Sequence, residues 1–328
     1  MGRVGRSVTR ADLVILLVTA AWSVNVVVVK VALHDSGPLS YAAVRFLLGG
    51  VGLCLLAWRL EGPIRLPRGR DLALVLTAAA LGTAINQASF TGALALNSAD
   101  FVALVQAATP LMVAGWLAGV TKQHFGWRVW AGLGLGLAGL ALVVDTGGGA
   151  RASALGTVVA LIMPVSWAAY LLVLPRLLRR HRPLTLSALV TILGALMLLP
   201  FGALEAVASP PRITLGWWGL LAYSSLVAVV ATTWLFLLGM ERLGPARTAA
   251  YTYLQPFMAV VAAAVLIGES VLPLQLLGGA IMLVGVTLGR PRPRRVGGSR
   301  GGSGAVCGTG GAKEHASAYQ FGVPAAAG

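Results

Sequence analysis

The sequence of 328 residues predicts an all-α, polytopic membrane protein whose ten transmembrane helices form two inverted five-helix repeats. Three observations predict this fold class. Hydrophobic residues make up 57% of the chain and charged residues only 11%, which is more apolar surface than a water-soluble core can bury. Basic residues gather in every second loop, and the two halves of the sequence resemble each other at a nearly constant spacing.

The first five expected spans are apolar runs close to the length of about 20 residues that a bilayer core requires. The first follows the basic start "MGRVGRSVTR" and is too long for a cleavable signal segment, so we expect it to be retained. The next four are separated by loops such as "HDSGP", "LPRGRD" and "KQHFGWR". The expected ranges are 11–33, 38–59, 71–93, 97–120 and 127–145.

The second five spans are bounded in the same way by Gly, Pro, Arg and Asp. The loops "DTGGGARAS", "RRHRP", "ASPPRIT", "ERLGPAR" and "GES" precede them in order. The expected ranges are 153–175, 184–204, 214–238, 246–268 and 272–289.

Loop charge predicts how these spans are oriented. The formal net charge is +15, and all but four of the 25 Lys and Arg residues fall in the tails and in every second loop. The exceptions are Lys30, Arg45, Arg151 and Arg212. Because cytoplasmic loops carry the excess of Lys and Arg, we expect both termini to be cytoplasmic in a bacterial inner (plasma) membrane. Nucleic-acid binding is not expected, since it requires basic residues gathered on one folded face.

Matching residues recur at a spacing of 145 or 146 positions. The pairs at 145 are Trp22 and Trp167, Pro38 and Pro183, and Gly49 and Gly194; those at 146 are Pro110 and Pro256, Met112 and Met258, Gly132 and Gly278, and Gly139 and Gly285. Because five spans is an odd number, the second unit must enter the membrane from the opposite side. Inverted repeats of this kind place a transporter's binding site at the repeat interface, near the midplane.

Four segments are therefore expected along the chain. They are a cytoplasmic N-terminal tail at 1–10, a first repeat at 11–145, a second repeat at 153–289 and a disordered cytoplasmic C-terminal tail at 290–328. The last of these is mostly Gly, Ser, Ala and Arg, with almost nothing to bury. The two cysteines offer no disulfide or metal framework, and no metal or cofactor is expected.

Three stretches carry a resemblance to a known family. They are "AAWSVNVVVVKVAL" followed by "PLSYAAVRFLLGG", then "LALNSADFVALVQAATPLMVA", and above all "ERLGPARTAAYTYLQPFMAVVAAAVLIGESVLPLQLLGGAIMLVGVTL". The sequence resembles the EamA-type transporters of the drug/metabolite transporter superfamily over residues 11–290. The resemblance implies two tandem EamA domains, a plasma-membrane location and export or exchange of small metabolites. Lys122 and Gln123 stand where the second repeat has Gly268 and Glu269.

Ionisable residues at membrane depth are costly, so each one within a span suggests a function. Arg45 lies seven residues past Pro38, roughly 10 Å below the outer surface at 1.5 Å per residue. It is interpreted either as an anion or carboxylate contact or as a residue that packs inward on carbonyls or an acid. Lys30, near the outer end of its span, can extend its ammonium group to the surface.

Uncharged polar side chains are expected near the bilayer centre. Trp22 and Asn25 share one helix face, as do Tyr251 and Gln255. An aromatic ring beside an amide suits a small amphipathic metabolite, although amides also join helices to each other. The predicted substrate-binding residues are Trp22, Asn25, Arg45, Asn86, Gln87, Gln106, Tyr251 and Gln255.

Pro110 and Pro256 are predicted to bend the fourth and ninth spans. Each lacks an N–H and would free a backbone carbonyl, that of Gln106 and that of Thr252 respectively. They are either symmetry-related hinges or fixed bends that shape the cavity.

The sequence thus predicts a secondary transporter that moves a small organic metabolite or drug by alternating access, in efflux or exchange. All ten acidic residues fall in loops, tails or helix ends, so no proton coupling through an acid at the midplane is expected. No catalytic motif is found, and the alternative is a polytopic protein without transport activity, such as a lipid-modifying enzyme or a sensor. The expected partners are the substrate and membrane lipid, and the protein is expected to be a monomer or a homodimer.

Overall fold

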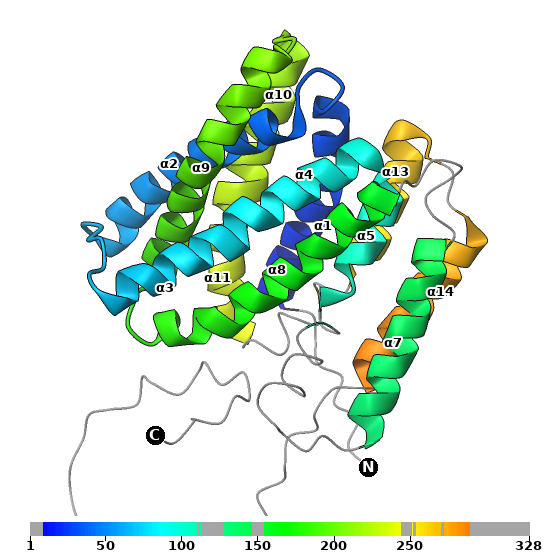
Figure 1. The fold of residues 1–328 in the computed structure, drawn as a ribbon. Helices are drawn as coiled ribbons and strands as arrows, with labels where there is room; N and C mark the ends of the chain where they lie inside the picture. Colours follow the sequence, from blue (N-terminus) through cyan, green and yellow to red (C-terminus); the bar gives the residue numbers. More distant parts are fainter. Residues whose placement is uncertain are drawn as a thin grey trace, which may run out of the picture.

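The computed structural model describes residues 9–109, 112, 127–145, 154–243, 251, 254–269 and 272–288, which form a helical bundle (Figure 1). Of the expected tails at 1–10 and 290–328, residues 1–8 and 290–328 lie outside the described residues, as do Pro110, Lys122 and Gln123. Each of the ten expected spans contains at least one described helix.

The described helices of the first repeat fall within a few residues of the expected spans, except that the fourth span is described mainly by α5, which ends at Gln106. They are α1 (Arg10–Ala32), α2 (Pro38–Glu61), α3 (Arg70–Ala79), η1 (Ala80–Ile85), α4 (Asn86–Leu96), α5 (Ala99–Gln106) and α7 (Trp127–Asp145). Those of the second repeat are α8 (Ala154–Leu178), α9 (Pro183–Ala208), α10 (Leu215–Ala222), η2 (Tyr223–Ala231), α11 (Thr232–Leu243), α13 (Gln255–Ile267) and α14 (Pro273–Leu288). Six described stretches are long and apolar enough to cross a membrane: α1, α2, α3 to α4, α8, α9 and Leu215–Met240.

The third and eighth spans contain a feature that the hydropathy pattern did not predict. Each is interrupted by a π-helical segment, η1 in the third and η2 in the eighth. Shifted by the repeat spacing of 145, η1 falls within η2. A π-helix shifts the hydrogen-bond register and frees backbone carbonyls, and such segments are frequent at functional sites.

Helices α2 and α9 pack against each other in a reciprocal manner (Figure 1). Glu61, at the end of α2, accepts hydrogen bonds from the N–H groups of Leu184 (3.2 Å) and Thr185 (2.7 Å) at the start of α9. Glu205, near the end of α9, accepts one from the N–H of Ser40 (2.8 Å) at the start of α2. Each carboxylate thus satisfies exposed donors of the opposite helix and complements its dipole.

Removing the Glu61 carboxylate is expected to weaken this pairing. In Glu61→Ala, the free energy of unfolding should fall by about 1–2 kcal/mol, the usual cost of losing an N-terminal cap. Thermal unfolding in detergent would measure this, with Glu61→Gln, which keeps an acceptor oxygen, as the matched variant. An unchanged melting temperature in Glu61→Ala would contradict the capping role.

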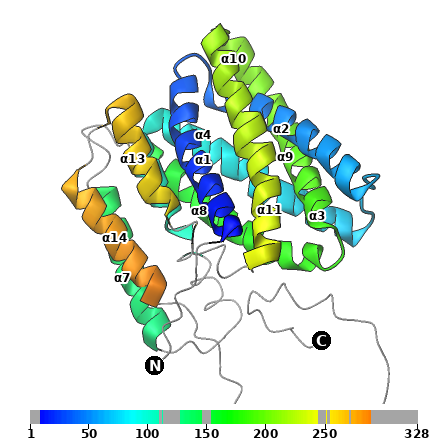
Figure 2. The same cartoon turned by 180° about the vertical axis from the view of Figure 1, so that it is seen from behind.

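Helices α7 and α14 form a second reciprocal pair, at one side of the bundle (Figures 1 and 2). A Cβ atom on Gly139 would lie 2.5 Å from the carbonyl oxygen of Gly278, and one on Gly285 would lie 2.6 Å from that of Gly132. These are the glycines that the sequence pairs at a spacing of 146. The contacts confirm the inverted arrangement of the repeats, because each helix presents the same small residues to its partner.

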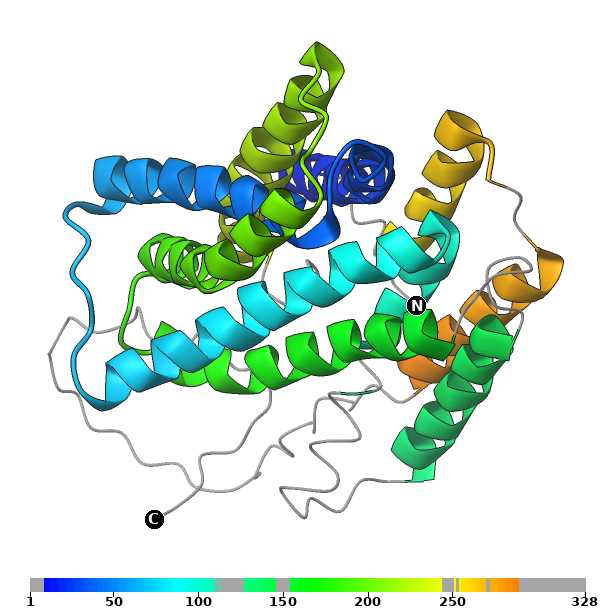
Figure 3. The same ribbon diagram turned by 45° about the horizontal axis from the view of Figure 1, so that its top comes forward.

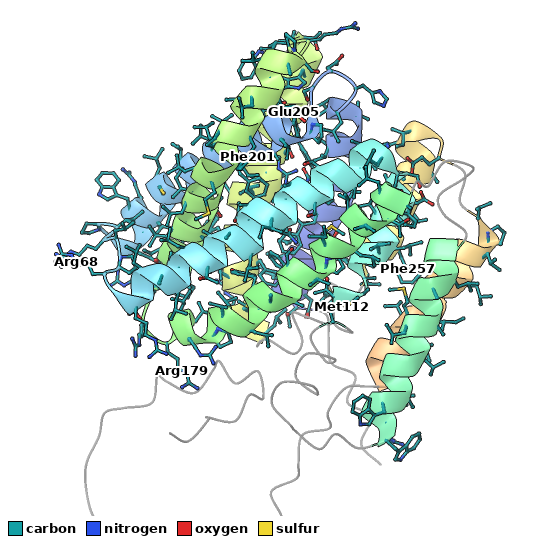
Figure 4. All side chains as sticks on the ribbon, in the orientation of Figure 1. Arg68, Met112, Arg179, Phe201, Glu205 and Phe257 are labelled. Carbon is teal, nitrogen blue, oxygen red and sulfur yellow. The ribbon has the colours of Figure 1, made fainter. Side chains whose placement is uncertain are left out.

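The two ends of the bundle differ in charge. Arg68 and Arg179 lie at one end and Glu205 lies at the other (Figure 4). We call the first the basic end; α2 finishes there and α9 begins there. The Arg180 guanidinium binds Asp71 at this end (2.9 Å).

Near the opposite end, the core packs α1 and α4 against α5, α8 and α13. Figure 2 shows α1 between α11 and α13, and Figure 3 shows α4 beside α8. This core is apolar and includes the fully buried side chains of Tyr41, Phe101, Leu104, Met163 and Leu221. The two repeats are therefore tightly packed at that end.

Candidate functional site

Arg45 of α2 lies inside the bundle with only 3% of its surface exposed. Its Nη2 donates a hydrogen bond to Oε1 of Gln87 (2.8 Å). Its Nε and Nη1 have no hydrogen-bond partner. The rings of Phe46 and Phe90 lie 4.5 Å and 5.8 Å from the guanidinium carbon, as cation–π contacts. The guanidinium is thus oriented by an amide and two rings, while two of its nitrogens remain open.

Gln87 and Asn86 continue from Arg45 toward the second repeat. Nε2 of Gln87 donates to Oδ1 of Asn86 (2.8 Å), and Nδ2 of Asn86 donates to the carbonyl oxygen of Met163 (2.9 Å) and to Oγ of Ser166 (3.3 Å). Asn86 is the first residue after η1. Three of the predicted binding residues therefore form one hydrogen-bonded chain that ends on α8.

Tyr41 and Ser224 connect Arg45 with Asn25 of α1. Tyr41 lies one turn before Arg45 on α2, near enough to interact with both the guanidinium and the Ser224 side chain. Oγ of Ser224 donates to Oδ1 of Asn25 (2.6 Å). We call this set the polar belt: Asn25, Tyr41, Arg45, Asn86, Gln87, Ser166 and Ser224. It joins both repeats inside a mainly apolar bundle.

Trp22 also reaches across the repeat interface. Its Nε1 donates to Oγ1 of Thr232 (2.9 Å) and to the carbonyl oxygen of Ala228 (3.1 Å) in η2, and its ring lies 5.2 Å from that of Phe236. One residue on, Oγ of Ser23 donates to the carbonyl oxygen of Gln255 (3.0 Å). The α1 face predicted from Trp22 and Asn25 therefore contacts η2, α11 and α13.

Two further predicted residues, Gln106 and Gln255, lie at helix termini. Helix α5 ends at Gln106, whose carbonyl accepts a hydrogen bond from Oγ1 of Thr109 (2.8 Å). Helix α13 begins at Gln255. Pro256 thus stands in the first turn of α13, where its missing N–H leaves no bond unmade. The bend expected at this residue stays a prediction, because residues 244–250 and 252–253 before α13 lie outside the described part of the chain.

Tyr251 lies apart from the polar belt. Its hydroxyl donates to Oδ1 of Asp12 (2.9 Å), and Asp12 also accepts from the N–H of Thr9 (2.8 Å) at the start of α1. That contact is at the end of a span and not near its middle, where we expected Tyr251. The shared face of Tyr251 and Gln255 stays a prediction, because residues 252 and 253 between them lie outside the described part of the chain.

Three charged residues meet at the end opposite the basic end. The Glu269 carboxylate accepts from the N–H groups of Ala99 (3.0 Å) and Asp100 (3.2 Å) at the start of α5, and it lies beside the buried Asp100 carboxyl. Nζ of Lys30 donates to the carbonyl oxygens of Leu94 and Asn97, each at 2.6 Å. The half-buried Lys30 therefore binds carbonyls at the end of α4.

Sequence reasoning did not single out Tyr41, Ser224 or Asp100. Tyr41 and Ser224 each occur in apolar stretches, where a hydroxyl is compatible with ordinary packing. A signal for Asp100 was its place after "NS" at the start of a span, where acids complement the helix dipole. For Glu269 the resemblance of the "GE" pair to the family was the available signal.

Burial raises the pKa of the Glu269 carboxyl above its ordinary value of 4.5, and the N–H groups of Ala99 and Asp100 oppose this only in part. A raised pKa favours the protonated form in the folded state. The contribution of Glu269 to stability should therefore be largest below pH 4.5 and be lost as pH rises through the raised pKa.

Comparing Glu269→Gln with the unchanged protein would test this pH dependence. The difference in melting temperature should shift in favour of Glu269→Gln as pH rises, because an amide cannot ionise. Thermal unfolding between pH 4 and pH 8 in one detergent and at one ionic strength would measure the difference. Parallel curves over the whole range would contradict the raised pKa.

Two surface hollows lie away from the polar belt. One of about 450 Å³ is lined by Val51, Cys54, Leu55, Trp58, Pro63, Ile64 and Ile192. Another of about 340 Å³ lies between α2, α9 and α10 and includes Leu199, Trp217 and Trp218. Both are lined mainly by apolar side chains, some of them well exposed, which suits contact with lipid.

Comparison with solved structures supports the fold. One crystal structure superimposes with a TM-score of 0.58 at 19% sequence identity, covering 85% of this chain and 95% of the other. Identity at that level bears on the fold alone.

Named relatives and a family model agree on the class of protein. The chain is 31% identical to the uncharacterized transporter YvbV of Bacillus subtilis, over 84% of this chain and 90% of that protein. It is 27% identical to a probable terminal-alkyne amino-acid exporter of Streptantibioticus cattleyicolor (89% and 99%) and to a probable amino-acid metabolite efflux pump of Escherichia coli (83% and 91%). The family model matches residues 9–145 and again 154–289. This multi-pass membrane transporter therefore belongs to the EamA-like transporter family.

Proposed function

We propose that this protein exports a small organic metabolite across the bacterial inner membrane by alternating access, with both termini in the cytoplasm. The polar belt is the observation that carries the proposal. It links α1, α2, α4, α8 and η2 across the repeat interface, and inverted-repeat transporters bind their substrates at that interface.

The packing at the end opposite the basic end supports alternating access. The core near the end opposite the basic end is apolar and tightly packed between the repeats. The positive-inside rule makes the basic end cytoplasmic, so the packed end faces outward. A transporter in this state is closed to the outside, and opening there requires the contacts between α5 and α13 to separate.

Export rather than import is favoured by the named relatives. Two of them are described as a probable exporter and a probable efflux pump.

Metabolite comparison would test the proposed function. Cells that express the protein should accumulate at least one small organic compound outside and deplete it inside, relative to cells without it. Trp22→Leu should reduce this export, because it removes the indole contacts to Thr232 and Ala228. Leu17→Ala, on the lipid-facing surface of the same helix (68% exposed), is the matched control and should export normally.

Two results would contradict the proposed function. One is an unchanged distribution of every compound in a broad panel although the protein is present in the membrane. The other is full export by Trp22→Leu. A C-terminal fluorescent fusion that matures only in the cytoplasm would test the orientation separately.

A further inference from the structure

Arg45 carries a positive charge that no nearby acid balances among the described residues. The elements packed against α2 around Arg45 are α4, α9 and η2. Helix α4 and η2 contain no acidic residue. The acid of α9 is Glu205, which accepts a hydrogen bond from the N–H of Ser40. Ser40 lies about 7.5 Å from Arg45 along the axis of α2, at 1.5 Å per residue. Tyr41 is the remaining titratable group beside the guanidinium.

A buried guanidinium without a counter-ion is energetically costly unless an anion binds beside it. A buried charge without a partner is strongly unfavourable, and natural proteins pair it or place it on a ligand pathway. The N–H groups on Nε and Nη1 of Arg45 point to a ligand because they have no acceptor in the protein. Guanidinium groups form strong, charge-assisted hydrogen bonds with carboxylates.

We propose that the substrate is an organic monoanion whose carboxylate binds Arg45, and that the membrane potential drives its export without a coupled ion. This inference rests on the proposed function. One negative charge on the ligand neutralises the one positive charge of the site. The rings of Phe46 and Phe90 beside the guanidinium provide apolar walls for the body of such a molecule.

The charge balance distinguishes a monoanion from a free amino acid. A zwitterion would bring an ammonium group as well as a carboxylate. None of the described residues that surround Arg45 supplies a carboxylate to bind that ammonium group. An N-acylated amino acid or a simple carboxylic acid satisfies the site with one charge.

The membrane potential is sufficient to export such an anion. The interior of a bacterial cell is electrically negative, so outward movement of one negative charge is favourable. Each 100 mV corresponds to an outside-to-inside concentration ratio of roughly 50-fold for one charge. The acids of the described residues that lie nearest the core, Asp12, Asp100 and Glu269, are all at helix ends. None is placed beside Arg45 to exchange a proton for the substrate.

Ligand binding tests the charge requirement. The probes are benzoate, phenylacetate and N-acetyl-phenylalanine, each paired with its uncharged primary amide, together with free phenylalanine as the zwitterion. At least one carboxylate should raise the melting temperature of the purified protein, whereas its amide and phenylalanine should not. The shift should be lost in Arg45→Gln and retained in reduced form in Arg45→Lys. Arg45→Gln should itself unfold no earlier than the unchanged protein, because it removes an unbalanced buried charge.

Flux in proteoliposomes tests the driving force. A potassium gradient with valinomycin sets the potential, and the carboxylate that binds is followed as it leaves the vesicles. Efflux should accelerate when the vesicle interior is negative, slow when it is positive, and be unaffected when a pH gradient is dissipated. Arg45→Gln should lose the potential-dependent component.

The results that would overturn the inference are distinct from those that would overturn transport. Equal binding of acids and amides, binding retained in Arg45→Gln, no binding by any acid of the panel, or efflux that requires a pH gradient would each overturn it. If metabolite comparison nevertheless identifies an exported neutral or zwitterionic compound, the proposed function stands and the anion site does not. Absence of any exported compound would remove both.

Discussion

Gln87→Glu is expected to weaken export strongly while leaving the fold at least as stable. The new carboxylate would lie where Oε1 of Gln87 lies, 2.8 Å from Nη2 of Arg45. It would give the guanidinium a permanent counter-ion inside the protein. A substrate carboxylate would then have to compete with that ion pair, so its affinity should fall by at least about tenfold, or about 1.4 kcal/mol.

Gln87→Glu should also change the free energy of unfolding, because Gln87 bonds to both Asn86 and Arg45. Glutamate cannot donate to Oδ1 of Asn86, and one neutral hydrogen bond is worth about 1 kcal/mol. The buried ion pair with Arg45 should more than offset this loss, because an unpaired buried charge costs about 3–5 kcal/mol.

The melting temperature of Gln87→Glu in detergent tests the expected stability, and its efflux in proteoliposomes tests the expected loss of export. Gln87→Leu is the matched control. It also loses the bond to Asn86 but adds no charge, so it should be less stable yet still bind the anion. Normal efflux by Gln87→Glu would show that Arg45 does not bind the transported charge.

Gly139→Ala is expected to separate α7 from α14. The added methyl group would lie 2.5 Å from the carbonyl oxygen of Gly278 and 2.7 Å from the backbone nitrogen of Met282. Neither backbone atom can move without shifting its helix. Overpacking of this kind costs about 1–3 kcal/mol, and the melting temperature in detergent should fall accordingly.

Gly134→Ala is the matched control on the same helix. A Cβ atom there would meet nothing within 4 Å, so packing is unaffected. Since alanine is favoured over glycine inside a helix by about 0.5–1 kcal/mol, this variant should be as stable as the unchanged protein or more so. Equal stability of the two variants would contradict the close crossing of α7 and α14.

Periodic features of the sequence were predictable because they arise from local physics. Span lengths follow from the thickness of the bilayer, and the repeat follows from residue pairs such as Gly139 and Gly285 that recur at one spacing. The predicted face of Trp22 and Asn25 was also local, because residues three apart on a helix point the same way. The structure places both side chains at the repeat interface.

Other features depend on neighbours that are distant in the sequence. Whether Arg45 has a counter-ion was left open, because the answer depends on α4, α9 and η2. The interruptions η1 and η2 and the start of α13 at Gln255 were not predicted either. Apolar runs look the same to a hydropathy pattern whether the backbone within them is α-helical, π-helical or broken.

The sequence by itself determined that this protein is a ten-span transporter of inverted repeats with a few polar groups within its spans. The reason is that hydrophobicity, loop charge and residue spacing are properties of the chain alone. Only the tertiary structure decided that Arg45, Gln87 and Asn86 form one hydrogen-bonded chain, and that Nε and Nη1 of Arg45 remain open. Hydrogen bonding and charge balance depend on distances between helices that packing sets, and no property of a single span contains them.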